Sequence, residues 1–377
     1  MQACDFSSPT RFLIGTVSKG LTNQRLGTLS YLVLAAALNR TLILSSVLSG
    51  NQIMCRGKRS GCLKALPISE VYDLRLLRAR LPPRVRACVA PPDFEAPADT
   101  AEAARDPELA RARVPPGRVV AYTRRRWGLE RAKFLRLREI WQDLLCCESD
   151  EYFRISRALV PAEPIRRAAA ALAATAAARW PRRRLTWLHL RLEADWASDG
   201  AVGRRVARCP FNNASSIVAK VSAALTRAPR PRAPTADDVL YVAGGAKHPA
   251  LLAELGALFG NRLLTAASAS EAVAVALRFE RLGGALPELN LGSASVDFVV
   301  GLLSDTIIGC DCSTFSKEVV RLRSLGRGAP KDTWTFSGPP YPQQRGLAPF
   351  LRDDPIYHSA VRSPYLPRGD LQRSARS

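Results

Sequence analysis

Short apolar runs alternate with helix-like stretches in the first part of the chain. Residues 11–17 and 41–44 are apolar runs of strand length, and residues 23–38 between them carry apolar side chains at helical spacing. Gly20 lies in the turn before that helix. This order predicts a βαβ unit, and such units are typical of parallel sheets.

A second series of the same kind follows an alanine-rich helix at residues 165–180, which ends at Pro181 and is expected to connect two halves. The predicted strands of the second half are residues 185–190, 239–243, 263–264 and 306–309, and its predicted helices are residues 215–225, 249–258, 296–303 and 314–323. The pattern therefore predicts an α/β fold with two successive domains, and the carboxyl edges of two such sheets suggest a ligand cleft between them.

The expected domains are residues 1–180, including the connecting helix, and residues 181–338. A Pro/Arg-rich tail at 339–377 is expected to be loosely ordered. Residues 90–118 are rich in Ala, Pro, Asp and Arg without a clean period, and we expect a surface excursion there.

The charge is strongly positive, at +22 from 55 basic and 33 acidic residues. The basic residues are nearly all arginines scattered among alanines and prolines, and aromatic side chains do not interleave with the short runs at 124–126 and 182–184. This pattern favours a solvated surface over a nucleic-acid platform. No apolar run is long enough to span a bilayer, and residues after Met1 do not resemble a signal peptide.

The chain has nine cysteines, so at least one is unpaired. Cys55 and Cys62 bracket a polar loop that a disulfide could close. No pair of C-x-x-C motifs is present, which argues against a zinc site. The cysteines alone leave the redox compartment open.

Three polar stretches sit where predicted strands end. The first, residues 20–25, places Gly20, Asn23 and Gln24 at a helix start, where backbone N–H groups attract anions. The alternative is a plain turn in which Asn23 caps the helix.

The second stretch places His189, Arg191, Glu193 and Asp195 on one face of a strand that runs past its carboxyl end. An arginine at such an edge can bind a diphosphate through two N–H groups. The alternative is an ion pair between Arg191 and one of the acids.

The third stretch runs from Asp297 through Ser304-Asp305 to Ser313, Thr314 and Phe315, where hydroxyl groups open a predicted helix. Such a helix start suits a phosphate, although an ordinary Ser/Thr N-cap is the alternative.

In this order the three stretches resemble the motifs of the GDP-fucose protein O-fucosyltransferase superfamily, the first motif continuing to residues 37–42. The resemblance implies a GT-B-like architecture, in which two Rossmann-like domains face a central cleft. It also implies an inverting, metal-independent transfer of fucose from GDP-fucose to a hydroxyl group of a protein or glycan.

The resemblance further implies roles for single residues. Arg191 and Asn23 would be catalytic, Asn23 reaching from the first domain toward the reacting sugar. The residues expected to bind the donor are Gly20, His189, Arg191, Asp297, Ser313, Thr314 and Phe315. No cofactor and no metal are expected, since the sequence has no Asp-x-Asp pair and Arg191 with the helix start would stabilise the departing diphosphate.

The sequence departs from the family at the candidate base, because some relatives have a Glu where this chain has Lys19 and Gly20. Glu193 and Asp195 are the alternatives. Three other readings stay open: transfer of rhamnose from a UDP donor, an inactive nucleotide-sugar-binding homologue, and, on charge alone, nucleic-acid binding.

The resemblance implies the lumen of the endoplasmic reticulum or Golgi, although the sequence shows no signal or anchor. Sequons at residues 39–41 and 213–215 are compatible with that compartment. The expected partners are a nucleotide-sugar donor and a protein or glycan acceptor, with no nucleic acid and no membrane span in this chain.

Overall fold

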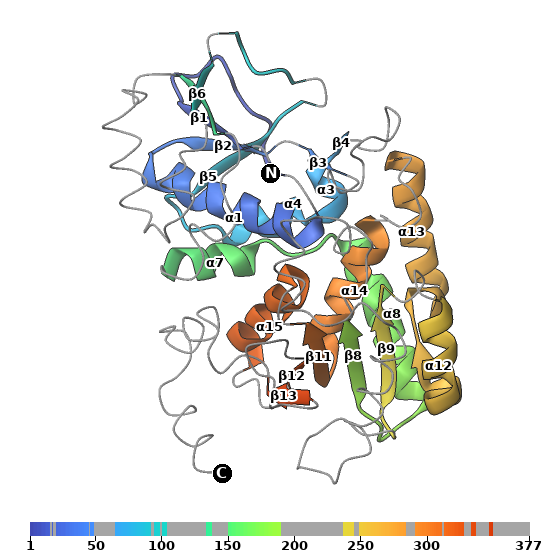
Figure 1. Cartoon of the computed structure of the whole chain (residues 1–377). Coiled ribbons are helices and arrows are strands. Elements are labelled where there is room, and N and C mark those ends of the chain that lie inside the picture. The colour runs from blue at the N-terminus through green and yellow to red at the C-terminus, as the bar shows by residue number, and fades with distance from the viewer. Residues whose placement is uncertain are drawn as a thin grey trace, which may run out of the picture. The chain divides into compact units, whose positions relative to one another are not determined.

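The computed structural model of the chain contains two compact units (Figure 1). The first is Met1–Glu163 with Leu282–Ala285, and the second is Pro164–Arg281 with Leu286–Ser377. The structure describes residues 1–15, 17, 20–44, 46–48, 65–91, 94–98, 100–103, 133–137, 150–189, 237–244, 249–283, 291–310, 313–327, 333–336 and 347–349. The alanine-rich helix α8 (Glu163–Arg179) lies almost entirely in the second unit, whereas the sequence predicted it in the first.

The first unit is built on a five-stranded sheet with the order β5-β2-β1-β7-β6, and all of its pairs are parallel. Its strands are β1 (Phe12–Gly15), β2 (Thr41–Leu44), β5 (Arg86–Val89), β6 (Ala101–Ala103) and β7 (Phe134–Leu137). The expected βαβ unit is confirmed, with helix α1 at Leu21–Ala37. Strand β6 lies within the surface excursion expected at residues 90–118 and pairs with β7 at the sheet edge, a strand that the sequence pattern did not predict.

Alternation along β1 sends side chains to two differently covered faces of the sheet. Gly15 faces α1, because a β-carbon at this position would lie 2.3 Å from the ring of Tyr31. Phe12 and Ile14 point to the other face, where they pack with Phe134 and the half-buried Phe6. The rings of Phe12 and Phe134 stack with their centroids 5.4 Å apart, a separation typical of aromatic pairs.

The remaining described elements of this unit are short. They are the antiparallel pair β3 (Val47–Leu48) and β4 (Ala65–Leu66) and the helices α3 (Ile68–Val71), α4 (Leu74–Arg80) and α7 (Asp150–Ala158).

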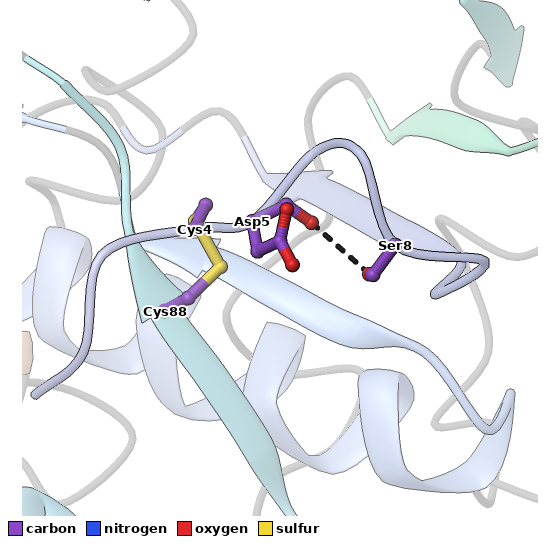
Figure 2. The surroundings of a disulfide bond; sticks show 4 residues. All are labelled: Cys4, Asp5, Ser8 and Cys88. Atoms are coloured by element: carbon purple, nitrogen blue, oxygen red, sulfur yellow. Dashed lines mark hydrogen bonds between the residues drawn. A yellow bond between two sulfur atoms is a disulfide. The ribbon is translucent and has the colours of Figure 1, made fainter.

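A disulfide between Cys4 and Cys88 ties the N-terminal segment to β5 (Figure 2). The backbone of the segment also pairs with the strand, since Cys4 donates to the carbonyl of Val89 and Val89 donates to that of Gln2, both at 3.0 Å. The two cysteines are 84 residues apart in sequence, and no local pattern pointed to their pairing. The suggested pair Cys55–Cys62 lies outside the described residues.

The second unit is built on a six-stranded sheet with the order β10-β9-β8-β11-β12-β13. Its strands are β8 (Leu185–His189), β9 (Val239–Ala243), β10 (Leu263–Leu264), β11 (Thr306–Cys310), β12 (Thr333–Phe336) and β13 (Leu347–Pro349). All of its pairs are parallel except β12–β13. The expectation of a loosely ordered tail is wrong for β13, which completes the sheet.

The described helices of this unit are α8, α12 (Pro249–Phe259), α13 (Ser270–Gly283), α14 (Leu291–Leu303) and α15 (Thr314–Arg327), with 3-10 turns at Gly260–Arg262 and Ala266–Ser268. Nowhere in the described part of the chain is a helix both long and apolar enough for a bilayer crossing. The predicted helix at 215–225 lies outside the described residues.

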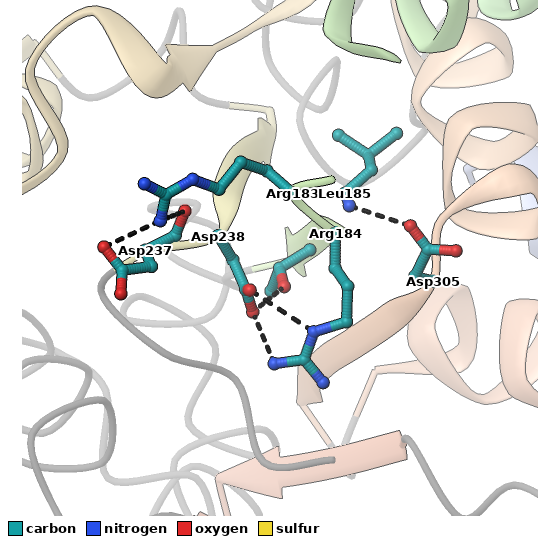
Figure 3. Close-up of polar contacts among 7 residues, drawn as sticks. Arg183, Arg184, Leu185, Asp237, Asp238 and Asp305 are labelled. Atoms are coloured by element: carbon teal, nitrogen blue, oxygen red, sulfur yellow. Dashed lines mark hydrogen bonds and ion pairs between the residues drawn. The ribbon is translucent and has the colours of Figure 1, made fainter. Parts of the chain in front are cut away.

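Polar contacts fix the amino ends of the central strands of this sheet (Figure 3). Arg184 pairs with the buried Asp238 at 3.0 Å, and Asp238 also accepts a hydrogen bond from Thr186. The carboxylate of Asp305 accepts a hydrogen bond from the backbone N–H of Leu185 at 2.9 Å. Asp305 is thus a structural residue that aligns β11 with β8. It lies at the amino ends of these strands, opposite their carboxyl ends.

Candidate functional site

The order of strands in the second unit changes direction at β8. Strands β9 and β10 lie on one side of β8, and β11 to β13 lie on the other. In open parallel sheets, ligands bind outside the carboxyl ends of the strands at such a switch point. His189 is the last residue of β8, and α15 begins shortly after β11 ends. The second and third sequence motifs therefore meet at this point.

A hydrogen bond joins these two motifs. Nδ1 of His189 lies 2.8 Å from the hydroxyl oxygen of Ser316, in the first turn of α15. Both side chains are buried, with exposed fractions of 6% and 0%. Ser316 directly follows Phe315 of the third motif and has no role in the sequence prediction. The available signal was its place one turn before the apolar pair Val319 and Val320.

The imidazole of His189 lies in an aromatic cluster. Its ring centroid is 5.5 Å from that of Trp187, with the planes 16° apart, and 4.8 Å from that of Phe315. Phe298 of α14 meets Phe315 edge-on at 5.8 Å. Trp187 and His189 share one face of β8 because they are two residues apart. The cluster fixes where the imidazole ring lies.

The start of α15 carries the predicted phosphate-binding residues. Ser313 is buried, and its hydroxyl accepts a hydrogen bond from the backbone N–H of Phe315 at 3.2 Å. This contact is an N-cap, as the alternative reading of the motif expects. Thr314 opens the helix and is half-buried. Since the first N–H groups of a helix have no intrahelical partner, the same helix start also offers donors to an anion.

Both carboxylate oxygens of Asp297 accept hydrogen bonds from other residues of the same unit. One carboxylate oxygen accepts from the Tyr241 hydroxyl at 2.5 Å, and the other accepts from the backbone N–H of Gly244 at 2.8 Å. Burial and the neighbouring carboxylate raise the pKa of Tyr241 well above 10.0. The backbone carbonyl of Asp297 accepts from the indole of Trp187 at 2.9 Å. Asp297 therefore links the turn after β9, where Gly244 has a φ of +70°, to the aromatic cluster.

Ser304, which also belongs to the third motif, has a structural role. Arg323 is buried and donates to the backbone carbonyls of Ser304 and of Asp305, the latter at 2.9 Å. The arginine thus satisfies the carboxyl end of α14, where helix carbonyls have no intrahelical partner.

The first motif lies at the start of α1 in the other unit. Gly20 is the N-cap residue in an extended conformation, and a β-carbon there would meet no atom within 4 Å. No side chain caps this helix end, so Asn23 does not act as the cap. Within the described residues, the buried Oδ1 of Asn23 has no hydrogen-bond partner.

The side chains next to Asn23 bind other parts of the protein, including Gln24, which the sequence analysis placed with Gly20 and Asn23 at a candidate anion site. Gln24 donates to the carbonyl of Leu48 at 2.8 Å and accepts from its N–H at 2.7 Å. Arg25 is buried and donates to the carbonyls of Ser156 and Leu159 at the carboxyl end of α7, at 2.8 and 2.5 Å. Among the residues that the structure describes, the side-chain carbonyl of Asn23 is thus the polar group of this turn without a hydrogen-bond partner.

The continuation of the first motif is structural as well. Arg40 is buried and donates to the carbonyl of Phe12 at 3.0 Å. Burial, assisted by nearby Arg11, lowers the pKa of the Arg40 guanidinium to about 10. Arg191 and the candidate bases Glu193 and Asp195 lie outside the described residues.

Comparison with solved structures finds the same fold in fucosyltransferases. The chain is similar to POFUT1 in complex with GDP-fucose, with a TM-score of 0.54 and 12% identity over 89% of this chain and 99% of that one. It is similar to the fucosyltransferase NodZ from Bradyrhizobium, with a TM-score of 0.51 and 13% identity over 90% and 98%. No protein-family model matches the sequence, and no curated protein matches it. The likeness confirms the α/β class, with the mainly parallel sheets of these enzymes.

Proposed function

We propose that this chain is a glycosyltransferase that transfers fucose from GDP-fucose to a hydroxyl group of a protein or glycan. The observation that carries the proposal is the meeting of His189, Phe315 and the α15 start at the switch point of β8 and β11. This happens within a fold similar, over most of its length, to that of POFUT1 in complex with GDP-fucose. A helix start beside a buried histidine is suited to a diphosphate.

The reaction would be a direct displacement. The acceptor oxygen forms a bond to the anomeric carbon while the bond from that carbon to the phosphate oxygen breaks, which inverts the carbon. The acceptor proton passes to a base that stays unassigned, and the bond's electron pair leaves with GDP. The N–H groups that open α15 would stabilise the charge on the departing diphosphate, together with His189 and Arg191.

We also propose that the transfer needs no metal ion. This proposal rests on the absence of an Asp-x-Asp pair from the sequence and on the expectation that Arg191 and the N–H groups at the start of α15 supply the positive charge instead. Asn23 stays a prediction for contact with the reacting sugar or the acceptor. Its buried side-chain carbonyl has no hydrogen-bond partner among the described residues, which supports a ligand contact, because such a group costs about 1–3 kcal/mol when it has no partner.

We also propose an oxidising compartment, the lumen of the endoplasmic reticulum or Golgi. The disulfide between Cys4 and Cys88 supports it, since disulfides persist in secretory compartments and are rare in the cytosol.

The test is a thermal unfolding series with GDP and UDP at equal concentrations, followed by turnover of GDP-fucose with and without EDTA. A ligand at a hundred times its Kd stabilises a protein by about 2.7 kcal/mol. GDP is expected to raise the Tm more than UDP, and EDTA is expected to leave turnover unchanged. Stronger stabilisation by UDP would favour the rhamnosyltransferase reading. If neither nucleotide raises the Tm, the proposed function is wrong.

A further inference from the structure

We propose that Ser316 is a positioning residue that fixes the orientation and the tautomer of His189. The inference rests on the proposed function, because it concerns how the histidine meets a diphosphate.

Ser316 holds the imidazole at one specific atom. Its hydroxyl oxygen is 2.8 Å from Nδ1 of His189, and both side chains are buried. The rings of Trp187 and Phe315 lie 5.5 and 4.8 Å from the imidazole, centroid to centroid. These rings restrict the plane of the imidazole, but they cannot distinguish its two flipped orientations. The hydrogen bond does, because a flip replaces Nδ1 with a carbon atom.

The same contact selects the tautomer. A neutral imidazole has one N–H donor and one acceptor nitrogen, and a serine hydroxyl can donate. If Ser316 donates to Nδ1, the proton resides on the other nitrogen, Nε2. An N–H at Nε2 is what a contact with an anionic phosphate oxygen requires. The opposite assignment would make Nε2 an acceptor, which a phosphate oxygen would repel. The 2.8 Å contact allows either direction, and the anionic ligand favours donation from Ser316.

A double-mutant cycle with GDP titrations tests whether Ser316 acts through His189. Ser316→Ala is expected to weaken GDP binding about tenfold, the effect of one lost hydrogen bond. In the His189→Ala background the same change is expected to have no further effect. Equal losses in both backgrounds, or no loss in either, would overturn the proposal.

Two variants separate this role from a merely structural one. Ser316→Cys keeps the shape with a much weaker donor, and it is expected to bind GDP as poorly as Ser316→Ala. It also serves if the alanine variant does not fold. Ser295→Ala is the matched control, because Ser295 is another buried helical serine of this unit, whose hydroxyl donates to the carbonyl of Leu291 at 2.7 Å. Ser295→Ala is expected to leave GDP affinity within twofold of the wild-type value.

The tautomer can be measured without any nucleotide. The chain has three histidines, so the full-length His248→Gln/His358→Gln protein has His189 alone. Its imidazole ¹⁵N shifts are expected to show the proton on Nε2, and Ser316→Ala in the same background is expected to show a mixture. A proton on Nδ1 before mutation would overturn the proposal. Because this measurement needs no ligand, failure of GDP to bind would contradict the proposed function and leave the tautomer assignment to be decided by the shifts.

Discussion

Gly301 of α14 lies directly against the indole ring of Trp187 in β8. A β-carbon at residue 301 would come within 3.0 Å of Cε2 of Trp187 and within 2.9 Å of a methyl group of Val319 in α15. The absence of a side chain at Gly301 lets the two helices approach the strand that carries His189. The packing around the candidate site therefore depends on this glycine.

Gly301→Ala is expected to destabilise the protein by about 1–3 kcal/mol, the usual cost of overpacking a core. The loss should appear although alanine favours helix by about 1 kcal/mol over glycine. Urea unfolding measures it. The control is Gly256→Ala in α12, where the nearest atom to a new β-carbon is 4.0 Å away. Gly256→Ala should be neutral or stabilising, and equal destabilisation by both variants would contradict the packing described.

Tyr241 is expected to make the fold sensitive to alkaline pH. Burial and Asp297 raise the pKa of the folded-state hydroxyl well above 10.0. The stability linked to this proton is present below pH 10 and is lost as the pH rises further, because the unfolded state then releases the proton and the folded state does not. In urea unfolding between pH 9 and about 11, Tyr241→Phe should lose stability less steeply than the wild type. If the free energy of unfolding falls equally steeply with pH in the two proteins, Tyr241 does not keep its proton in the folded state above pH 10.

Replacing Asn23 is expected to affect turnover, whereas replacing its neighbour Gln24 is expected to affect stability. Asn23→Ala removes a buried carbonyl without a described partner, so it should leave the Tm unchanged or higher while reducing turnover of GDP-fucose. Gln24→Ala removes two hydrogen bonds to Leu48, so it should cost about 1–3 kcal/mol of stability. Melting curves paired with turnover on both variants measure this. A strongly destabilised Asn23→Ala protein would mean that Asn23 has a structural role.

Six strands could be predicted because they are continuous apolar runs followed by glycine or polar residues: β1, β2, β8, β9, β10 and β11. β2, β9 and β10 begin and end where the pattern predicts, and α15 begins at the expected residue. The edge strands β6 and β13 were missed, as were β5, β7 and β12. β6 has the sequence Ala-Glu-Ala, and β13 follows a proline-rich segment, so pairing with a neighbour rather than local preference determines them.

The candidate site could be predicted in part. Strand alternation and a hydroxyl-rich helix start pointed to His189 and Ser313. The motif pattern could not separate Gln24 and Arg25, which satisfy distant backbone groups, from Asn23, which does not. Nor could it show that the carboxylate of Asp297 binds Tyr241 and Gly244, because those partners are more than 50 residues away.

The disulfide is expected to stabilise the first unit. Replacing both Cys4 and Cys88 with alanine should cost about 2–5 kcal/mol, since the bridge closes a long loop. A reducing agent should lower the Tm of the wild type, and it should lower that of the double variant much less. An equal response of both proteins would mean that another bridge outweighs this one.

The most direct test of the central claim is a GDP titration paired with a melting temperature on Thr314→Asp. An aspartate in the first turn of α15 suits the positive end of the helix, so the Tm should hold, while its charge should repel a diphosphate. Thr314→Asn is the uncharged control and should lose much less GDP affinity than Thr314→Asp. The account predicts a stable Thr314→Asp protein that does not bind GDP. A stable Thr314→Asp protein that binds GDP as tightly as the wild type would contradict a donor site at the start of α15.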